Sequence, residues 1–154
     1  MSFLEKTSIP ILSEEGKDIP YETRKNWKEL WIVDPIDGTA NFVAGIPAWC
    51  VIIACVYDDV TKVAAIYEPS HGELFWGMLG GGAFMNDAAI KVSDTTGLNI
   101  GNTGVGMNGR SATQPVAHFL SDLIQRGGLF YRNASGGLML CYVAAGRLIG
   151  YVEE

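Results

Sequence analysis

The chain has 154 residues, of which 48% are hydrophobic and 18% charged, and its formal net charge at pH 7 is −6. This length and composition predict one globular domain with a substantial hydrophobic core. The acidic balance and the lack of a Lys/Arg cluster argue against a polymeric nucleic acid as a partner, because a phosphate backbone must be neutralised by basic side chains. A small phosphorylated substrate is still possible, because bound divalent cations would make the electrostatic potential at the site positive despite the negative net charge of the protein.

The first residues favour strands joined by short connections. Residues 9–12 predict a short strand that runs into Ser13-Glu14-Glu15-Gly16, and residues 17–29 predict a polar loop with one helical turn. Leu30–Val33 predicts the next strand. Trp49–Tyr57 is apolar on both faces, which is typical of a central strand covered on both sides.

A meander is predicted after this strand. Asp58-Asp59 is expected to turn the chain into Lys62–Tyr67, and Glu73–Trp76 predicts a further strand. The glycine run Gly77–Gly82 lacks the Gly-Lys-Ser/Thr ending of a phosphate-binding loop, so it is interpreted as a hairpin connection. Residues 83–92 predict one more small hairpin.

The second half predicts two helices and a last strand. Gly104–Gly109 matches the GxGxxG pattern, but no amphipathic helix opens behind it and no acid lies about twenty residues on, so dinucleotide binding is not expected. Val116–Gln125 has helical spacing and stops at Arg126-Gly127-Gly128. Leu138–Ala145 predicts a second, largely buried helix and Ile149–Val152 a strand. Because strands and helices alternate, we expect a layered α/β arrangement.

The cysteines and the N-terminal residues indicate the cellular compartment in which the protein is expected. Cys50, Cys55 and Cys141 form neither a CxxC pair nor a His–Cys metal pattern, and they are predicted to be reduced core residues. Residues 1–10 carry no signal-peptide pattern, and no apolar run reaches membrane-spanning length. We therefore expect a cytoplasmic protein without a membrane partner.

The clearest chemical signal is an apolar strand that ends at two carboxylates, Asp34 and Asp37, followed at once by Gly38 and Thr39. Carboxylates are the hard oxygen ligands that Mg²⁺ prefers, and backbone amides at a helix start bind anions. Pro-x-Asp-Gly is also ordinary turn chemistry. The hydrophobic residues before the first carboxylate, and a second acidic pair at Glu14-Glu15, favour metal-dependent phosphate chemistry over a plain turn.

These residues resemble the inositol monophosphatase family, the Mg²⁺-dependent, lithium-sensitive phosphatases. Asp34–Phe42 is similar to the family's first signature, Asp-Pro-Ile-Asp-Gly-Thr followed by Asn-Phe, and Ser13-Glu14-Glu15 resembles its upstream Gly-Glu-Glu element. The likeness continues through residues 65–69, 80–86 and 135–147. It implies a single domain over residues 1–154 with the family's α+β sandwich of alternating helix and sheet layers.

The resemblance implies a site with two or three Mg²⁺ ions. Glu14 would bind metal and help orient the attacking water, and Glu15 would be its less directly involved neighbour. Asp34 would bridge two metals, the backbone carbonyl of Ile36 would bind one, and Asp37 would bind the second.

The same resemblance implies the phosphate and substrate contacts. The amides of Gly38 and Thr39 would hold phosphate together with Asp37, and the Thr39 hydroxyl would touch the nucleophilic water. Ser135 matches a substrate-pocket serine, and Glu153 matches an acid that contacts a substrate hydroxyl. From its own sequence context, however, Ser135 also suits a helix cap and Glu153 a solvated terminal charge.

Three other residues that suggest chemistry are interpreted more simply. His71 and His118 have no acid or cysteine at ligand spacing, so they are predicted to be surface residues. Arg110 precedes a predicted helix, where it could meet a substrate phosphate, and it is not counted as a site residue.

The chain departs from the family pattern at both ends. Family members begin with one or two long helices, whereas only twelve residues precede Ser13, and the family's Trp-Asp motif, which supplies a further metal ligand, is expected soon after Glu153. The resemblance therefore implies an incomplete fold, a fragment of a larger enzyme with little or no activity alone. It also implies a homodimer.

The implied function is metal-dependent hydrolysis of a phosphate monoester on a small polyol or sugar. A 3′(2′),5′-bisphosphate nucleotidase is the alternative, because Ser13–Gly16 and Pro20–Trp27 resemble that branch. Ala40-Asn41-Phe42 stands where the nucleotidases carry Lys-Glu-Phe, which favours the inositol phosphatase side. A third hypothesis is a catalytically impaired fragment that binds phosphate or serves only in dimerisation.

Overall fold

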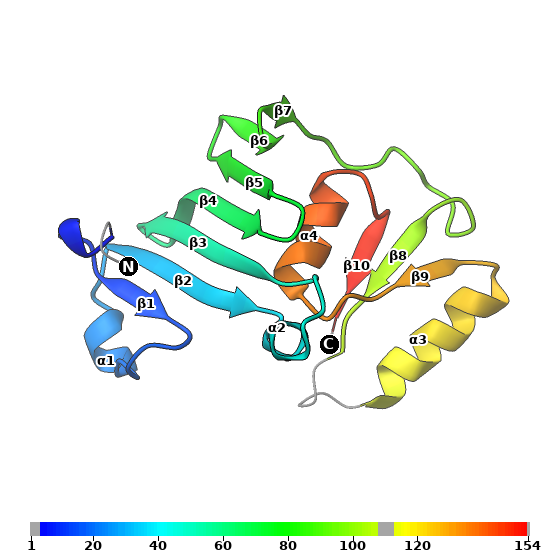
Figure 1. The fold of residues 1–154 in the computed structure, drawn as a ribbon, viewed down its shortest axis with the longest axis horizontal. Coiled ribbons are helices and arrows are strands. Elements are labelled where there is room, and N and C mark those ends of the chain that lie inside the picture. The colour runs from blue at the N-terminus through cyan, green and yellow to red at the C-terminus, as the bar shows by residue number, and fades with distance from the viewer. Residues whose placement is uncertain (1–3, 108–112, 154) are drawn as a thin grey trace.

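Two β-sheets and the helix between them organise the chain (Figure 1). The computed structural model describes residues 4–107 and 113–153. The strands of the larger sheet lie side by side in chain order: β1 (Ile11–Ser13), β2 (Glu29–Asp37), β3 (Cys50–Tyr57), β4 (Val60–Glu68), β5 (Glu73–Met78), β6 (Gly82–Met85) and β7 (Ala88–Ala89). β1 pairs with β2 in parallel, and every later pair is antiparallel.

Short turns make this meander. Asp58 and Asp59 both have positive φ angles, 48° and 59°, which is the backbone geometry of the tight turns that match the twist of a hairpin. The helical turn predicted before the second strand is α1 (Tyr21–Arg24), and a 3₁₀ turn lies at Leu4–Lys6. The predicted meander is confirmed, and the glycine run after β5 is a hairpin connection as expected.

The smaller sheet has three parallel strands in the order β10 (Gly150–Val152), β8 (Asn102–Val105), β9 (Leu129–Tyr131). Parallel neighbours need crossover connections, and these contain α3 (Thr113–Gln125) and α4 (Gly136–Ala144). Both helices and β10 agree with the prediction, whereas β8 and β9 were not predicted. The layered α+β fold is the predicted one.

Gly104, the first glycine of the GxGxxG match, serves packing. Gly104 lies inside β8, and a Cβ there would come within 2.6 Å of the Met139 side chain and 3.0 Å of Leu148. The missing side chain lets α4 approach the smaller sheet closely.

The core lies where α4 meets both sheets. Leu138, Met139 and Cys141 of α4 are buried, and so are Cys50 on β3 and Phe75 on β5. Leu140 lies on an exposed face of α4 and is 60% exposed, but the other residues of the helix are buried or half-buried, so the prediction of a largely buried helix is confirmed. β3 is central in the sheet, but its middle residues stay half-buried, so the prediction of full cover on both faces is wrong.

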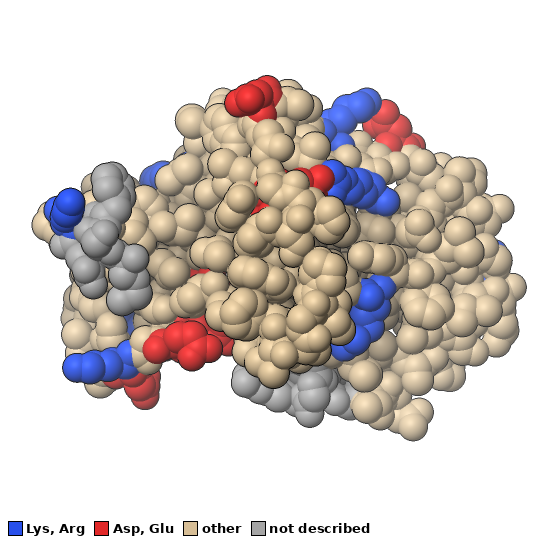
Figure 2. All heavy atoms as spheres, in the orientation of Figure 1, with Lys and Arg blue, Asp and Glu red and all other residues tan. Residues whose placement is uncertain are grey.

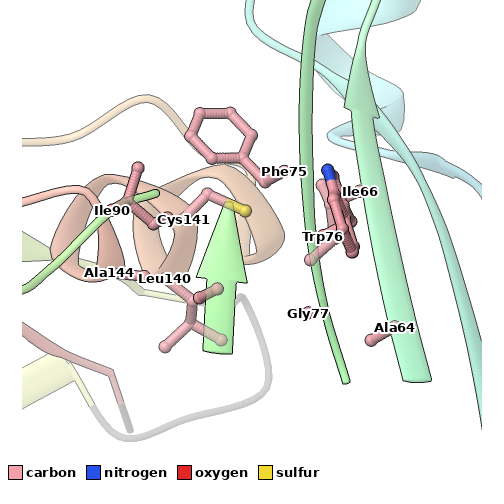
Figure 3. Close-up of a pocket in the computed structure, with 10 residues that line it drawn as sticks. Ala64, Ile66, Phe75, Trp76, Gly77, Ile90, Leu140, Cys141 and Ala144 are labelled. Atoms are coloured by element: carbon pink, nitrogen blue, oxygen red, sulfur yellow. The ribbon is translucent and has the colours of Figure 1, made fainter. Parts of the chain in front are cut away.

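An apolar cavity of about 230 Å³ borders this exposed face of α4. Figure 3 shows Leu140, Cys141 and Ala144 of α4 on one side of it and Trp76 and Ala64 of the larger sheet on the other. The three cysteines are free and buried, as predicted, and burial raises the pKa of the Cys141 thiol to about 12. In the part of the chain that the structure describes, no helix is long and apolar enough to cross a membrane.

Candidate metal centre

Two carboxylates from separate segments meet at the end of the β1–β2 pair. Ser13 pairs with Val33, and the backbone N–H of Glu14 donates to the Val33 carbonyl at 3.1 Å, so Glu14 comes to lie beside Asp34. The charge of Asp34 raises the pKa of the Glu14 carboxyl, and a hydrogen bond between the two carboxyl groups raises it further. On the face drawn in Figure 2, acidic side chains gather around the loop that follows β1, whereas Lys and Arg are scattered.

This pair fits a cation. Two ionised carboxylates at this spacing repel each other unless a proton or a positive ion lies between them. Glu14 is exposed to solvent, so burial contributes less to its raised pKa than Asp34 does. The structure thus places these two predicted metal ligands side by side, and their binding of metal stays a prediction.

The strand predicted over Leu30–Val33 continues to Asp37 in the structure, and the bend after Asp34 is a bulge within this strand, β2. The pairing of β2 with β3 shifts register between Asp34 and Asp37. Asp34 Oδ1 accepts a hydrogen bond from the Ile36 N–H at 3.0 Å, and the Thr39 hydroxyl donates to the Ile36 carbonyl at 3.0 Å. The predicted metal-binding carbonyl and the predicted water-binding hydroxyl are therefore held together.

The chain turns at Gly38, which has a φ of 90° and leads into α2 (Thr39–Ala44). A Cβ at Gly38 would lie 3.0 Å from the Ala48 carbonyl oxygen and 3.2 Å from Ser135 Cβ, so both the conformation and the space require glycine. The first amides of a helix have no partner within it. In α2 these are the backbone amides of Thr39 and Ala40, which follow closely after the bulge.

Asp37 faces the start of α4. Its Oδ2 accepts hydrogen bonds from the Ser135 hydroxyl at 2.6 Å and the Gly137 N–H at 2.7 Å, with Cys50 Sγ at 3.5 Å. Ser135 also caps α4, since its hydroxyl oxygen accepts from the Leu138 N–H at 3.4 Å. The interpretation of Ser135 as a helix cap is confirmed, and its contact with substrate stays a prediction.

The predicted ligands form two adjacent groups. Glu14 and Asp34 make one, and Asp37 with Ser135 makes the other. Within residues 4–107 and 113–153, no three His, Cys, Asp or Glu side chains are gathered closely enough to form a metal cage. Among the causes that raise the pKa of the Glu14 carboxyl, the charge of Asp37 has the smallest effect.

Glu153 lines a cavity of about 360 Å³ next to Asp37. The Tyr151 hydroxyl donates a hydrogen bond to the Glu153 carboxylate, and burial together with that bond raises the pKa of Tyr151. The phenol is thus kept as a donor. Glu153 is exposed, as expected of a solvated charge, and its contact with a substrate hydroxyl stays a prediction.

Two residues of this region were missed from the sequence. Asn41 is buried and its side-chain amide donates to the carbonyls of Ala48, at 2.6 Å, and Asn133, at 2.5 Å, which ties α2 to the segment before α4. Arg132 lines the cavity that Glu153 lines. Its only signal in the sequence was its place three residues before Ser135. Arg110 lies outside the described residues.

The family model described as the inositol monophosphatase family matches residues 5–154. The chain belongs to the inositol monophosphatase family. Nus factor SuhB of Vibrio cholerae is 37% identical over 153 residues, which are 96% of this chain and 56% of that protein. This chain thus spans about half the length of the curated relatives it matches.

Solved structures of family members have the same fold. The extragenic suppressor protein suhB of Bartonella henselae has a TM-score of 0.90 and 32% identity, over 99% of this chain and 59% of that one. An IMPase/NADP phosphatase described as complexed with Mg²⁺ and phosphate has a TM-score of 0.83 and 25% identity, over 99% of this chain and 56% of that one.

Proposed function

We propose that the protein hydrolyses a phosphate monoester on a small polyol or sugar, in a reaction that depends on divalent cations, with Mg²⁺ as the physiological ion. The observation that carries this proposal is the convergence of Glu14 and Asp34 from two strands beside the bulge at Ile36. Membership of the inositol monophosphatase family supports the reaction class, and the relative described with Mg²⁺ and phosphate supports the ions.

The ion site would be made by carboxylate and carbonyl oxygens. Glu14, Asp34 and the Ile36 carbonyl would hold one ion, and Asp34 with Asp37 would hold another. Bound divalent ions lower the pKa of water and neutralise charge on a phosphate. The Thr39 hydroxyl is fixed on the Ile36 carbonyl, where it would orient the attacking water.

Phosphate would be held by the amides that open α2. The backbone N–H groups of Gly38 and Thr39 follow the bulge directly, and they would bind phosphate oxygens without any side chain. Asp37, already held by Ser135 and Gly137, would need little reorganisation to take its place beside the phosphate. Positioning of this kind carries much of the rate acceleration in phosphoryl transfer.

The test is phosphate release from myo-inositol 1-phosphate with Mg²⁺ and with EDTA, in the wild type and in Asp34→Asn. We expect release to need Mg²⁺ and to fall at least about 100-fold in the variant, because each ligand supports charge neutralisation in the transition state. Asp59→Asn, in the exposed β3–β4 turn, is the matched control and should keep the wild-type rate. Turnover that persists in EDTA contradicts the proposal.

Two further measurements separate the alternatives. Adenosine 3′,5′-bisphosphate is assayed in parallel, and preferential release from it favours the bisphosphate nucleotidase. Mg²⁺ titration by calorimetry is done on the same samples. Mg²⁺ binding without release from any substrate identifies a catalytically impaired phosphate-binding protein.

A further inference from the structure

We infer that Arg132 forms a second anion subsite in the cavity beside Asp37. The preferred substrate would then be a sugar or polyol that carries an oxyanion in addition to the phosphate that is hydrolysed. The inference rests on the proposed function for the identity of the reacting phosphate. The second oxyanion, a phosphate or a carboxylate, would bind the guanidinium group at a distance from the Glu14–Asp34 pair.

The cavity is large enough for such a molecule. Its volume of about 360 Å³ falls in the range of small-molecule sites. The backbone keeps it open at Gly106, where a Cβ would lie 2.3 Å from the Tyr151 hydroxyl oxygen and 2.8 Å from the Glu153 carboxyl carbon. Glycine at this position leaves room for Tyr151 and Glu153 at the cavity wall.

The polar groups of the cavity are of two kinds. Asp37, Glu153 and the Tyr151 hydroxyl supply oxygen atoms, which suit the hydroxyl groups of a polyol. Among the described residues that line the cavity, Arg132 is the one basic residue. The pKa of Tyr151 is raised, first by burial and then by Glu153, and the nearby positive charge of Arg132 offsets a small part of that rise.

The guanidinium group is poorly partnered within the described residues. It donates one long hydrogen bond, 3.4 Å, to the Met107 carbonyl, and no Asp or Glu of residues 4–107 and 113–153 forms a salt bridge with it. An arginine has five N–H donors in a planar fork that matches two oxygens of a carboxylate or phosphate. A neutral polyol end would leave most of these donors unused.

The experiment compares substrates that differ only at the end away from the phosphate. Sorbitol 6-phosphate ends in a neutral hydroxymethyl group, and 6-phosphogluconate ends in a carboxylate on the same carbon skeleton. Fructose 1,6-bisphosphate tests a second phosphate instead. For each, kcat/KM and the calorimetric Kd in the presence of Mg²⁺ are measured with the wild type and with Arg132→Gln and Arg132→Lys.

Arg24→Gln, on the exposed α1, removes one positive charge elsewhere and is the matched control. We expect Arg132→Gln to weaken binding and kcat/KM for one or both substrates that carry a second anionic group by roughly 10- to 100-fold, the range for loss of a charge-assisted hydrogen bond. Sorbitol 6-phosphate and the Arg24→Gln variant should be unaffected. Arg132→Lys should recover part of the loss, because it keeps the charge without the fork.

The outcomes separate this inference from the proposed function. Arg132-dependent binding of a compound with a second anionic group, without turnover, supports the subsite and contradicts the phosphatase. Turnover with equal losses for sorbitol 6-phosphate and for the compounds with a second anionic group, or with no loss, supports the phosphatase and overturns the subsite. Failure of the wild type to bind either compound with a second anionic group more tightly than sorbitol 6-phosphate also overturns the subsite.

Discussion

Gly38 is the residue on which the shape of the site depends most directly. It holds a left-handed conformation, and a Cβ there would press against the Ala48 carbonyl and the side chain of Ser135. Gly45 closes the same helix, also with positive φ, 71°, but nothing lies within 4 Å of the position a Cβ would take. A comparison of substitutions at Gly38 and Gly45 therefore separates the effect of backbone strain from the effect of steric crowding.

We therefore predict that Gly38→Ala lowers the free energy of unfolding by about 2–4 kcal/mol, since strain and steric clash add. Gly45→Ala should lower it by only about 1 kcal/mol, the strain alone. Urea unfolding of both variants measures the difference. Equal losses would show that the contacts of Gly38 relax freely.

Ser135 has two hydrogen-bonding roles that one substitution removes together. Ser135→Ala takes away the cap of α4 and a donor to the Asp37 carboxylate, and we predict a loss of about 1–3 kcal/mol in the free energy of unfolding. Ser135→Thr keeps the hydroxyl and should lose less. The exposed Ser121, in α3, is the control: Ser121→Ala should be near neutral in the same unfolding assay.

Single residues of the site were predictable where their neighbours in the sequence carried the signal. Asp34, Asp37, Gly38 and Thr39 are consecutive or nearly so, and their motif indicated the bend. Arg132 was not predictable, because its place in the cavity depends on β9, a strand of three exposed residues without an alternating pattern.

At the scale of elements, the turn between β4 and β5 is held together by hydrogen bonds to a buried carboxylate, that of Glu68. The Glu68 carboxylate is fully buried and accepts hydrogen bonds from the N–H groups of Ser70, at 2.8 Å, and His71, at 2.9 Å, and it also contacts the His71 ring at 2.7 Å. Burial by itself raises the pKa of Glu68, but the hydrogen bonds outweigh it and the pKa is lowered. His71 is exposed, as predicted, but an acid does lie next to it.

This turn predicts a pH dependence of stability. Because the folded pKa of Glu68 lies below its ordinary value of 4.5, its stabilisation is present above about pH 4.5 and is lost as the pH falls through the folded value. Glu68→Gln should lower the free energy of unfolding by about 1–3 kcal/mol at pH 7. The gap to the wild type should shrink below pH 4.5, as measured by urea unfolding from pH 7 to pH 3.

The control for this prediction is Glu22→Gln, on the exposed face of α1, which should change stability little at any pH. A gap between Glu68→Gln and the wild type that stays constant down to pH 3 would contradict the assigned role of the carboxylate.

Elements were predictable according to the length of their pattern. β3, β4 and α3 carry long apolar or periodic runs, and their prediction was close. The strands β8 and β9 have four and three residues, and β8 contains Gly104, whose small size is required by a contact with Met139 far along the chain. No local pattern can report such a contact.

For the molecule as a whole, α4 is the main link between the two sheets, since it contacts β3 and β4 on one side and β10 on the other. Leu138 is fully buried at this junction, and Leu140, on the same helix, is 60% exposed. We predict that Leu138→Ala lowers the free energy of unfolding by about 2–5 kcal/mol, whereas Leu140→Ala lowers it by less than about 1 kcal/mol.

The same variant should weaken the cooperativity between the sheets. All four tryptophans, Trp27, Trp31, Trp49 and Trp76, lie in or beside the larger sheet, so their fluorescence reports on it alone. Circular dichroism at 222 nm reports mainly on α3 and α4. In the wild type the two transitions should coincide, and in Leu138→Ala they should separate. Coincident transitions in the variant would contradict this role of the helix.

The strand order has a consequence for how the protein acquires activity during synthesis. The larger sheet joins strands that follow one another in the chain, so it can assemble while the ribosome is still adding residues. Asp37 lies in this early part, but its partners Ser135 and Gly137 are translated about a hundred residues later. Until α4 has been synthesised, the nascent chain therefore lacks the hydrogen bonds that fix the Asp37 carboxylate, and the geometry of this part of the site forms only afterwards.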